Sequence, residues 1–199
     1  LSGEIVNNFW NPNTLVQTAT DASFFAIMAI GATLVIISGG IDLSVGSIYA
    51  LAGVSIARTL RSLGSTSATS TTLVGLAVGL GVGLACGILN GVLVVGLRVH
   101  PFIITLGTMW VLRGVAFVAT KAESIRVPDA LTKTIKASLG LAEGLYPVPT
   151  LVMILVTIIG ALYLTRTVMG RHIFAFGGNL EASRFAGLPL ARIQIGVYT

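Results

Sequence analysis

The chain has 199 residues, of which 54% are hydrophobic and only 10% are charged. A soluble domain carries roughly a quarter charged residues, so this composition argues against a soluble enzyme, a nucleic-acid-binding protein or a disordered protein. The formal net charge of +5 indicates no nucleic-acid partner, because Lys and Arg gather in the short cytoplasmic loops of membrane proteins. Composition therefore predicts a multi-pass membrane protein.

Long uncharged runs locate the expected membrane spans, because a transmembrane helix needs about 20 mostly apolar residues. These runs are too long and too continuously apolar for the strands of a membrane barrel. We therefore predict an all-α fold, a polytopic transmembrane helical bundle with a broken helix near 38–47. In chain order we expect a loop over 1–21, two apolar pieces over 22–57, spans over 73–97 and 102–120, a polar loop over 121–148, a span over 149–165, a basic loop over 166–192 and a further span from about 193.

The basic loop sets the orientation. Residues 166–192 hold four arginines and one acidic residue, which predicts a cytoplasmic loop. Because each span carries the chain to the other side of the membrane, this orientation places 98–101 inside, and 1–21, 58–61 and 121–148 outside. Because the chain begins with Leu1 and stops inside an apolar stretch, we expect 1–199 to be part of a longer membrane domain.

A glycine stripe runs along the expected span 73–97. In lipid, small residues at this spacing let another helix backbone approach closely. Each four-residue step turns about 40° beyond a full circle, so the stripe winds slowly and suits a crossing partner. The predicted helix-packing residues are Gly75, Gly79, Gly83, Gly87 and Gly91.

The run at 38–47 interrupts an apolar stretch with two glycines and an acid. Backbone freed by such a break must be buried in protein or line a cavity. Asp42 would cost about 2.5–3.5 kcal/mol facing lipid on insertion scales. Asp42 and Ser44 therefore either cap the second helical piece, beginning at Leu43 or Val45, or take part in a substrate path.

Arg113 lies near the middle of the span 102–120. An intramembrane arginine indicates a functional site with a partner, and Asp42 and Glu123 are the candidate partners. We hypothesise an Arg113–Asp42 ion pair. The alternative is a shifted helix in which Arg113 reaches the membrane interface.

Other polar or aromatic side chains also fall within spans: Asn90, Thr105, Thr108 and Trp110. They either join helices through hydrogen bonds or line a sugar-sized passage.

The basic loop contains signals for a short helix over about 180–186. Asn179 suits the N-cap and Glu181 the first turn, while Gly187 suits the C′ position and Pro189 stops the helix. The apolar residues Leu180, Phe185 and Leu188 need a surface, either the groove of a partner protein or the membrane.

No catalytic motif is present. The sequence holds no Walker A motif, no Gly-x-Ser-x-Gly, no His-Glu-x-x-His and no Cys/His cluster. We therefore expect a protein that is not itself an enzyme.

Five segments together resemble the permease subunits of ATP-binding-cassette (ABC) sugar importers of the ribose/xylose/galactose type, in the branched-chain amino acid permease superfamily. They are GGIDLSVGS at 39–47, GILNG at 87–91, RVHPFIITLGT at 98–108, LRG at 112–114 and the loop 170–187.

The resemblance implies a membrane domain over 1–199, with the first span and the C-terminal half missing. It implies a second permease copy, an extracytoplasmic sugar-binding protein and a separate ATPase that carries the ATP and Mg²⁺, so that no cofactor belongs to this chain. The cell membrane would be its location and lipid its surroundings. The ATPase-coupling residues would be Gly178, Asn179, Leu180, Glu181, Ala182, Arg184, Gly187 and Leu188.

The translocation path or its polar packing would involve Asp42, Ser44, Asn90, Thr105, Trp110 and Arg113. Two other classes stay open from the residues alone. One is an ATP-independent carrier or channel, with Asp42 and Arg113 as coupling charges. The other, an intramembrane enzyme, lacks the necessary motifs.

Overall fold

The computed structural model describes residues 10–64, 67–136 and 147–199, and within them the chain forms nine α-helices and no strand. This confirms the predicted all-α fold. The helices are α1 (Pro12–Ile37), α2 (Val45–Leu63), α3 (Ala68–Leu97), α4 (Pro101–Thr120), α5 (Asp129–Ile135), α6 (Val148–Arg166), α7 (Val168–Gly178), α8 (Leu180–Phe185) and α9 (Leu190–Tyr198).

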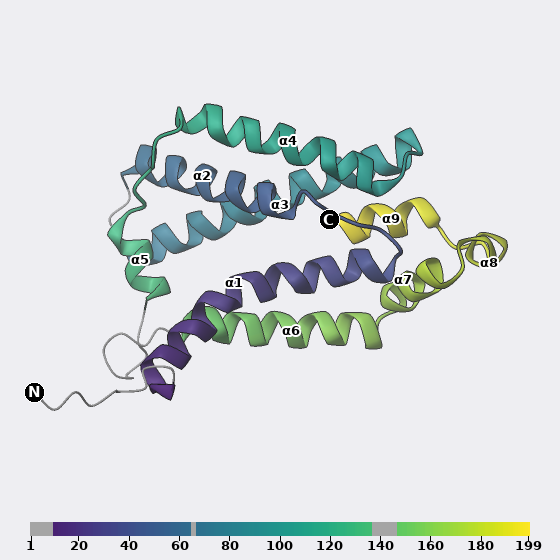
Figure 1. The fold of residues 1–199 in the computed structure, drawn as a ribbon, viewed down its shortest axis with the longest axis horizontal. Helices are drawn as coiled ribbons and strands as arrows, with labels where there is room; N and C mark the ends of the chain where they lie inside the picture. Colours follow the sequence, from purple (N-terminus) through teal and green to yellow (C-terminus); the bar gives the residue numbers. More distant parts are fainter. Residues whose placement is uncertain (1–9, 65–66, 137–146) are drawn as a thin grey trace, which may run out of the picture.

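The long helices form two groups. Helices α2, α3 and α4 pack together, and α1 packs along α6 (Figure 1). The short helix α9 contacts α3, α7 and α1, so it joins the two groups at one end of the bundle.

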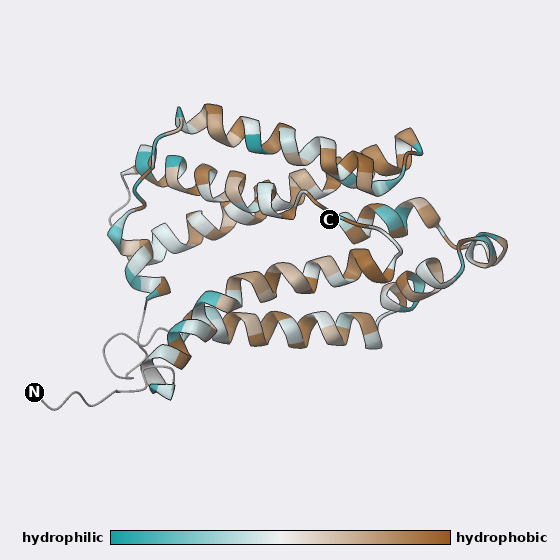
Figure 2. Cartoon of the chain, in the orientation of Figure 1, coloured by the Kyte–Doolittle hydropathy of each residue, from teal (hydrophilic) through white to brown (hydrophobic). Residues whose placement is uncertain are grey.

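Four helices are long and apolar enough to cross a membrane: α1, α3, α4 and α6. In each, only 6–22% of the most apolar stretch is buried inside the chain. Figure 2 shows hydrophobic residues along these helices and hydrophilic ones gathered around α5 and the connections. Apolar helices with such exposed surfaces suit lipid or other membrane subunits as surroundings.

The predicted break is confirmed, because α1 ends at Ile37 and α2 begins at Val45. Figure 1 shows the intervening segment returning from the end of α1 toward the middle of the bundle, where α2 starts. Helix α2 carries Arg58 and Arg61 near its C-terminus and is not among the four candidate spans.

The connections between the helices lie at the two ends of the bundle in the grouping that we predicted from loops alternating across the membrane. The turn between α3 and α4 lies at the same end as α7 and α8, and α5 lies at the other end with the last turn of α2 and the first turn of α3 (Figure 1). Which end is cytoplasmic remains a prediction from the arginines of 166–192.

Two expected boundaries were wrong. Residues 12–21, expected as a loop, belong to α1, while 1–9 lie outside the described residues. Helix α3 begins at Ala68 rather than near residue 73. In both segments hydroxyl groups bond to carbonyls of the preceding turn, as Thr18 does to Thr14 (2.8 Å) and Thr72 to Ala68 (2.8 Å), so these polar residues fit a helix.

Two expected loops also contain helices. The loop 121–148 includes α5, whose first turn holds Asp129 and last turn Lys133, charges that favour a helix by opposing its dipole. The basic loop 166–192 includes α7, which begins where the Thr167 hydroxyl accepts the Gly170 N–H at 3.0 Å. Neither short helix has a long apolar run to reveal it in the sequence.

The glycine stripe divides between two partners. A Cβ at Gly79 would lie 3.2 Å from Ile56 Cδ1 on α2, and Gly75 also faces Ile56. A Cβ at Gly91 would lie 2.8 Å from Ile195 Cα on α9, and one at Gly87 would meet the Tyr198 carbonyl. A Cβ at Gly83 would have no neighbour within 4 Å. The slow winding of the stripe thus carries its two ends to different helices.

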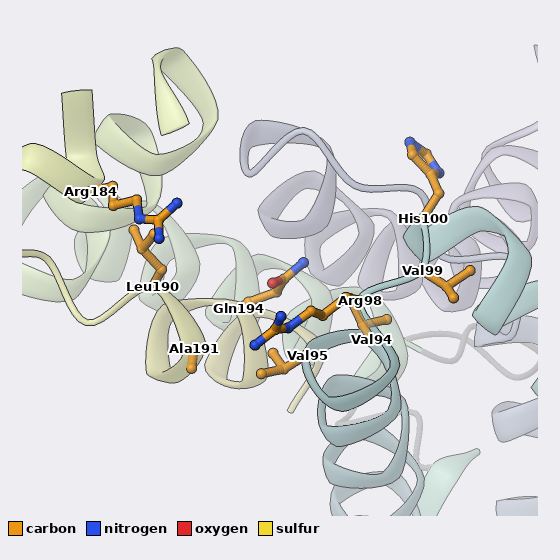
Figure 3. A pocket seen from close by; sticks show the side chains of 9 residues that line it. All are labelled: Val94, Val95, Arg98, Val99, His100, Arg184, Leu190, Ala191 and Gln194. Atoms are coloured by element: carbon orange, nitrogen blue, oxygen red, sulfur yellow. The ribbon is translucent and has the colours of Figure 1, made fainter. Parts of the chain in front are cut away.

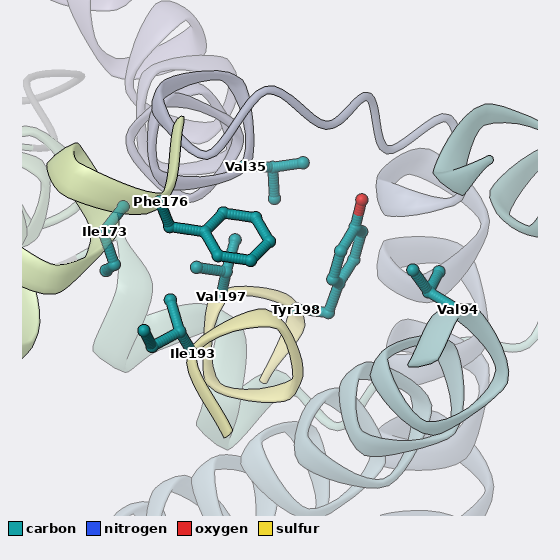
Figure 4. Packing of buried hydrophobic residues seen from close by; sticks show 7 residues of the cluster. All are labelled: Val35, Val94, Ile173, Phe176, Ile193, Val197 and Tyr198. Carbon is teal, nitrogen blue, oxygen red and sulfur yellow. The ribbon is translucent and has the colours of Figure 1, made fainter. Parts of the chain in front are cut away.

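The main cluster of buried apolar side chains lies where α9 meets α1, α3 and α7 (Figure 4). Ile193 is fully buried in this cluster, as is Ile173 of α7, and Phe176 of α7 also belongs to it. The cluster comprises Val35, Val94, Ile173, Phe176, Ile193, Val197 and Tyr198. This core ties the loop helices to the spans and to the end of α1, directly before the break.

Candidate functional site: the break before α2 and the exposed helix α8

Two glycines end α1. The Gly40 N–H donates to the Val35 carbonyl and the Gly39 N–H to the Ile36 carbonyl, both at 2.9 Å. This is the Schellman pattern, and Gly39 takes the left-handed φ of +79° that it needs. The chain can therefore leave the helix with its last carbonyls satisfied.

Thr105 of α4 holds the extended segment that follows. Its hydroxyl accepts the Leu43 N–H at 3.2 Å and lies 3.1 Å from the Ile41 carbonyl, to which it can donate. Thr105 is fully buried. One side chain thus satisfies backbone groups that would otherwise be unpaired inside the membrane.

Asp42, Ser44 and Asn90 form a chain of hydrogen bonds. The Asn90 Nδ2 donates to the Ser44 Oγ at 2.7 Å, and this hydroxyl donates to Asp42 Oδ1 at 2.6 Å. The same carboxylate oxygen accepts the Ser44 N–H at 2.7 Å. Helix α2 begins at Val45, with Ser44 at the N-cap, so Asp42 supports the helix start through Ser44 rather than by capping it directly.

Several buried polar atoms near the break accept or donate no hydrogen bond among the described residues: Asn90 Oδ1, Ser47 Oγ and the Tyr198 hydroxyl. Asp42 is partly exposed, and with Tyr198 it lines a cavity of about 280 Å³ between α1, α2 and α9. Of the six polar and aromatic residues predicted for a path or packing role, Asp42 lines this cavity, whereas Ser44, Asn90 and Thr105 do not.

Trp110 and Arg113 lie elsewhere. Both are exposed on α4, and no salt bridge joins Arg113 to Asp42 or Glu123 in the described chain. The hypothesised Arg113–Asp42 ion pair is therefore wrong. Thr105 and Leu112 define the buried stripe of α4, and Arg113 is turned about 100° from Leu112, away from the break.

Helix α8 has the local structure that the sequence predicts. The Asn179 Oδ1 accepts the Ala182 N–H at 2.8 Å. At the other end, the Leu188 N–H donates to the Ser183 carbonyl and the Gly187 N–H to the Arg184 carbonyl, each at 3.1 Å. Gly187 has a φ of +74°. A cap and a Schellman motif therefore fix both ends of this one-turn helix.

The side chains of α8 and of the turn that follows it differ in exposure. Phe185 is 90% exposed and Leu180 52% exposed, whereas Ser183 is buried and Leu188 packs against the core cluster. Glu181 and Arg184 occupy the first and last turns. Gly178 and Ala182, also predicted for coupling, are exposed. Leu180 and Phe185 are therefore accessible for contact with a surface outside the described chain.

Sequence reasoning missed three residues that the structure brings to these sites. Tyr198 borders the break, Gln194 lines a second cavity beside it, and Gly177 lets α7 approach the Ile37 carbonyl. Tyr198 and Gln194 fall in the short run before the end of the chain, where the pattern indicated only a further span. No group of three or more potential metal ligands occurs in the described residues.

Residues 14–199 match the family described as branched-chain amino acid transport system / permease component. The chain is 37% identical, over 193 residues, to the ribose import permease protein RbsC of Escherichia coli (strain K12), an alignment that covers 96% of this chain and 58% of that protein. It is 33% identical over 192 residues to the inner membrane ABC transporter permease protein YjfF of the same strain, covering 96% of this chain and 56% of YjfF.

A third relative is the L-arabinose transport system permease protein AraH of Escherichia coli (strain K12), 35% identical over 178 residues, 88% of this chain and 51% of AraH. The chain thus spans between 51% and 58% of the length of these relatives. No solved structure gives a significant match. With four apolar helices and a family match over nearly its whole length, the chain is a multi-pass protein of the cell membrane and belongs to the branched-chain amino acid transport system permease family.

Proposed function

We propose that the chain forms part of the permease subunit of an ABC importer, in which it lines the translocation path for a monosaccharide of the ribose/xylose/galactose class. Family membership supports a permease role. The printed names of the relatives, ribose import for RbsC and L-arabinose transport for AraH, support a pentose-sized sugar.

The exposed helix α8 carries the proposal, as the docking site of a separate ATPase subunit. Its two fixed ends hold Leu180 and Phe185 at the surface. Helix α7 connects α8 to α1, α6 and α9, and α9 borders the break through Tyr198. A displacement of α8 on ATPase binding would therefore be transmitted through packed helices to the polar cluster formed by Asp42, Ser44 and Asn90. ATP and Mg²⁺ belong to the ATPase in this proposal, which leaves this chain without a catalytic role.

The proposal includes two further protein partners, and lipid around the exposed spans. A second permease copy would cover part of α1, α3, α4 or α6, lipid would cover the rest, and an extracytoplasmic binding protein would deliver sugar at the end where α5 lies. Asp42 is the residue of the polar cluster best placed to meet a sugar hydroxyl, because one carboxylate oxygen is free of hydrogen bonds from the described chain.

The test co-purifies the permease and its ATPase in detergent. In one variant, Leu180→Ala and Phe185→Ala truncate the exposed side chains of α8. In the matched control, Val111→Ala and Phe117→Ala truncate similarly exposed side chains of α4. We expect ATPase recovery to fall about tenfold or more with the α8 variant and to stay within about twofold with the control.

Undiminished ATPase recovery with the α8 variant would reject the docking site. Sugar uptake by vesicles that contain the permease and no ATPase would reject the importer class in favour of an ATP-independent carrier.

A further inference from the structure

A cavity of about 700 Å³ opens at the end of α3, between that helix, α8 and the first turn of α9. Figure 3 shows Arg98 and Arg184 on different elements around it, with the Gln194 amide nearer to Arg98 in this view. Its apolar lining includes Val94, Val95 and Leu190. The cavity therefore combines two cations and an amide with a hydrophobic wall.

Arg98 and Arg184 are both exposed side chains. Among the described residues, neither the Arg98 nor the Arg184 side chain makes a hydrogen bond or an ion pair. The only acid in the sequence of 147–199 is Glu181, and it does not line this cavity. Two cations that line one cavity, with no acidic side chain among its lining residues, favour a bound anion, which would accept charge-assisted hydrogen bonds from them.

Arg98 occupies a position where its side chain has a conformational cost. It ends α3 with a left-handed φ of +53°, a conformation that favours glycine or asparagine. Arginine at this position places a cation directly after the last apolar turn of a span, at the level where lipid headgroups lie.

His100 also borders the cavity, but its Nδ1 accepts the Phe102 N–H at 3.3 Å and so caps α4. The side chains of this cavity that can donate hydrogen bonds to an anion are therefore those of Arg98, Arg184 and Gln194.

We propose that this cavity binds the phosphodiester headgroup of an anionic phospholipid. Arg98 and Arg184 hydrogen-bond the phosphate oxygens, the Gln194 amide donates between them, and the valines contact the start of the acyl region. Basic pockets between transmembrane helices on the cytoplasmic side recognise such headgroups. Since Arg184 belongs to α8 and Arg98 to α3, the bound lipid would hold α8 against the bundle.

Native mass spectrometry tests this binding, with the protein in an uncharged detergent and phosphatidylglycerol or phosphatidylcholine of identical acyl chains as probes. The test variant combines Arg98→Gln with Arg184→Gln. The control combines Arg166→Gln with Arg192→Gln, which removes the same charge at the same end from residues that do not line the cavity. We expect phosphatidylglycerol to bind about tenfold more weakly to the test variant, less than about twofold more weakly to the control, and phosphatidylcholine to be unaffected.

A second variant guards against misfolding. Arg98→Lys with Arg184→Lys keeps both charges and should retain phosphatidylglycerol binding within about threefold, with thermal unfolding in the same detergent as the check on folding. Equal losses in the glutamine variant and its control would overturn the site. So would displacement of the lipid by millimolar inorganic phosphate, which would indicate a free-anion site. ATPase association lost in the glutamine variant, with lipid binding unchanged, would assign the arginines to the ATPase and also overturn it.

Discussion

The Asn90 amide donates to the Ser44 hydroxyl at 2.7 Å, and this bond joins the C-terminal third of α3 to the residue directly before α2. Both side chains are fully buried. The Ser44 hydroxyl in turn donates a hydrogen bond to Asp42 Oδ1, so a chain of hydrogen bonds anchors the break to a membrane-spanning helix. Because Ser44 and Asn90 are shielded from water, their polar groups have no alternative partner if one of these hydrogen bonds is lost.

Replacing Asn90 with alanine should therefore lower the free energy of unfolding by about 1–2 kcal/mol, since it removes an interhelical bond and leaves the Ser44 hydroxyl short of a donor. Unfolding in detergent measures the effect. Thr157→Ala is the control, because the Thr157 hydroxyl bonds only to the Met153 carbonyl of its own helix and its loss should change stability by less than about 0.5 kcal/mol. Equal destabilisation by both variants would mean that the bond between α3 and the break adds nothing specific.

The two ends and the middle of the glycine stripe should respond differently to alanine. At Gly87 a methyl group would meet the Tyr198 carbonyl, and because backbone cannot rotate aside, we expect a loss of about 1–3 kcal/mol. At Gly83 a methyl group meets nothing within 4 Å, so Gly83→Ala should be neutral or stabilise by up to about 1 kcal/mol through helix propensity. Thermal unfolding of the two variants in one detergent compares them directly.

If Gly83→Ala destabilises as strongly as Gly87→Ala, then a partner outside the described chain covers the middle of the stripe. In that case the α3–α9 contact would not explain the spacing.

Features that depend on residues close together in the sequence could be predicted. Features that depend on how each helix is oriented about its own axis could not. Asn179 and Gly187 bracket α8 as predicted, because a cap and a C′ glycine act within a few residues. The clustering of Asp42, Ser44, Asn90 and Thr105 could only be suggested, since it needs α3 and α4 to turn these residues toward the break.

The wrong prediction for Arg113 and the missed contact of Gly177 have the same origin. Arg113 is one residue from the buried Leu112, so a single helical step decides whether it faces Asp42. Gly177 falls in a segment that we predicted to be a loop. Its close approach to the Ile37 carbonyl depends on packing between segments that are far apart in the sequence.

Thr105→Val should loosen the extended segment without removing volume. The Leu43 N–H loses its acceptor and the Ile41 carbonyl its donor, so we expect amide exchange around Leu43 to quicken by about tenfold, which corresponds to about 1.4 kcal/mol of local opening. Hydrogen–deuterium exchange with mass spectrometry measures it. Thr108→Val is the control on the same helix, because the Thr108 hydroxyl bonds to the Thr105 carbonyl. Unchanged exchange at 41–43 in Thr105→Val would show that other contacts hold this segment.

Asp42 and Arg113 should act independently. Asp42 accepts both of its hydrogen bonds from Ser44, whereas Arg113 is exposed on α4 and shares no partner with it. In a double-mutant cycle, Asp42→Ala and Arg113→Ala should therefore add within about 0.3–0.5 kcal/mol of unfolding free energy. Asp42→Ala and Ser44→Ala supply the positive control, with an expected coupling of at least about 1 kcal/mol, because each removes the other's partner. A coupling of that size between Asp42 and Arg113 would mean that the membrane-embedded protein brings the two charges together, and the ion pair that the sequence suggested would then have to be restored.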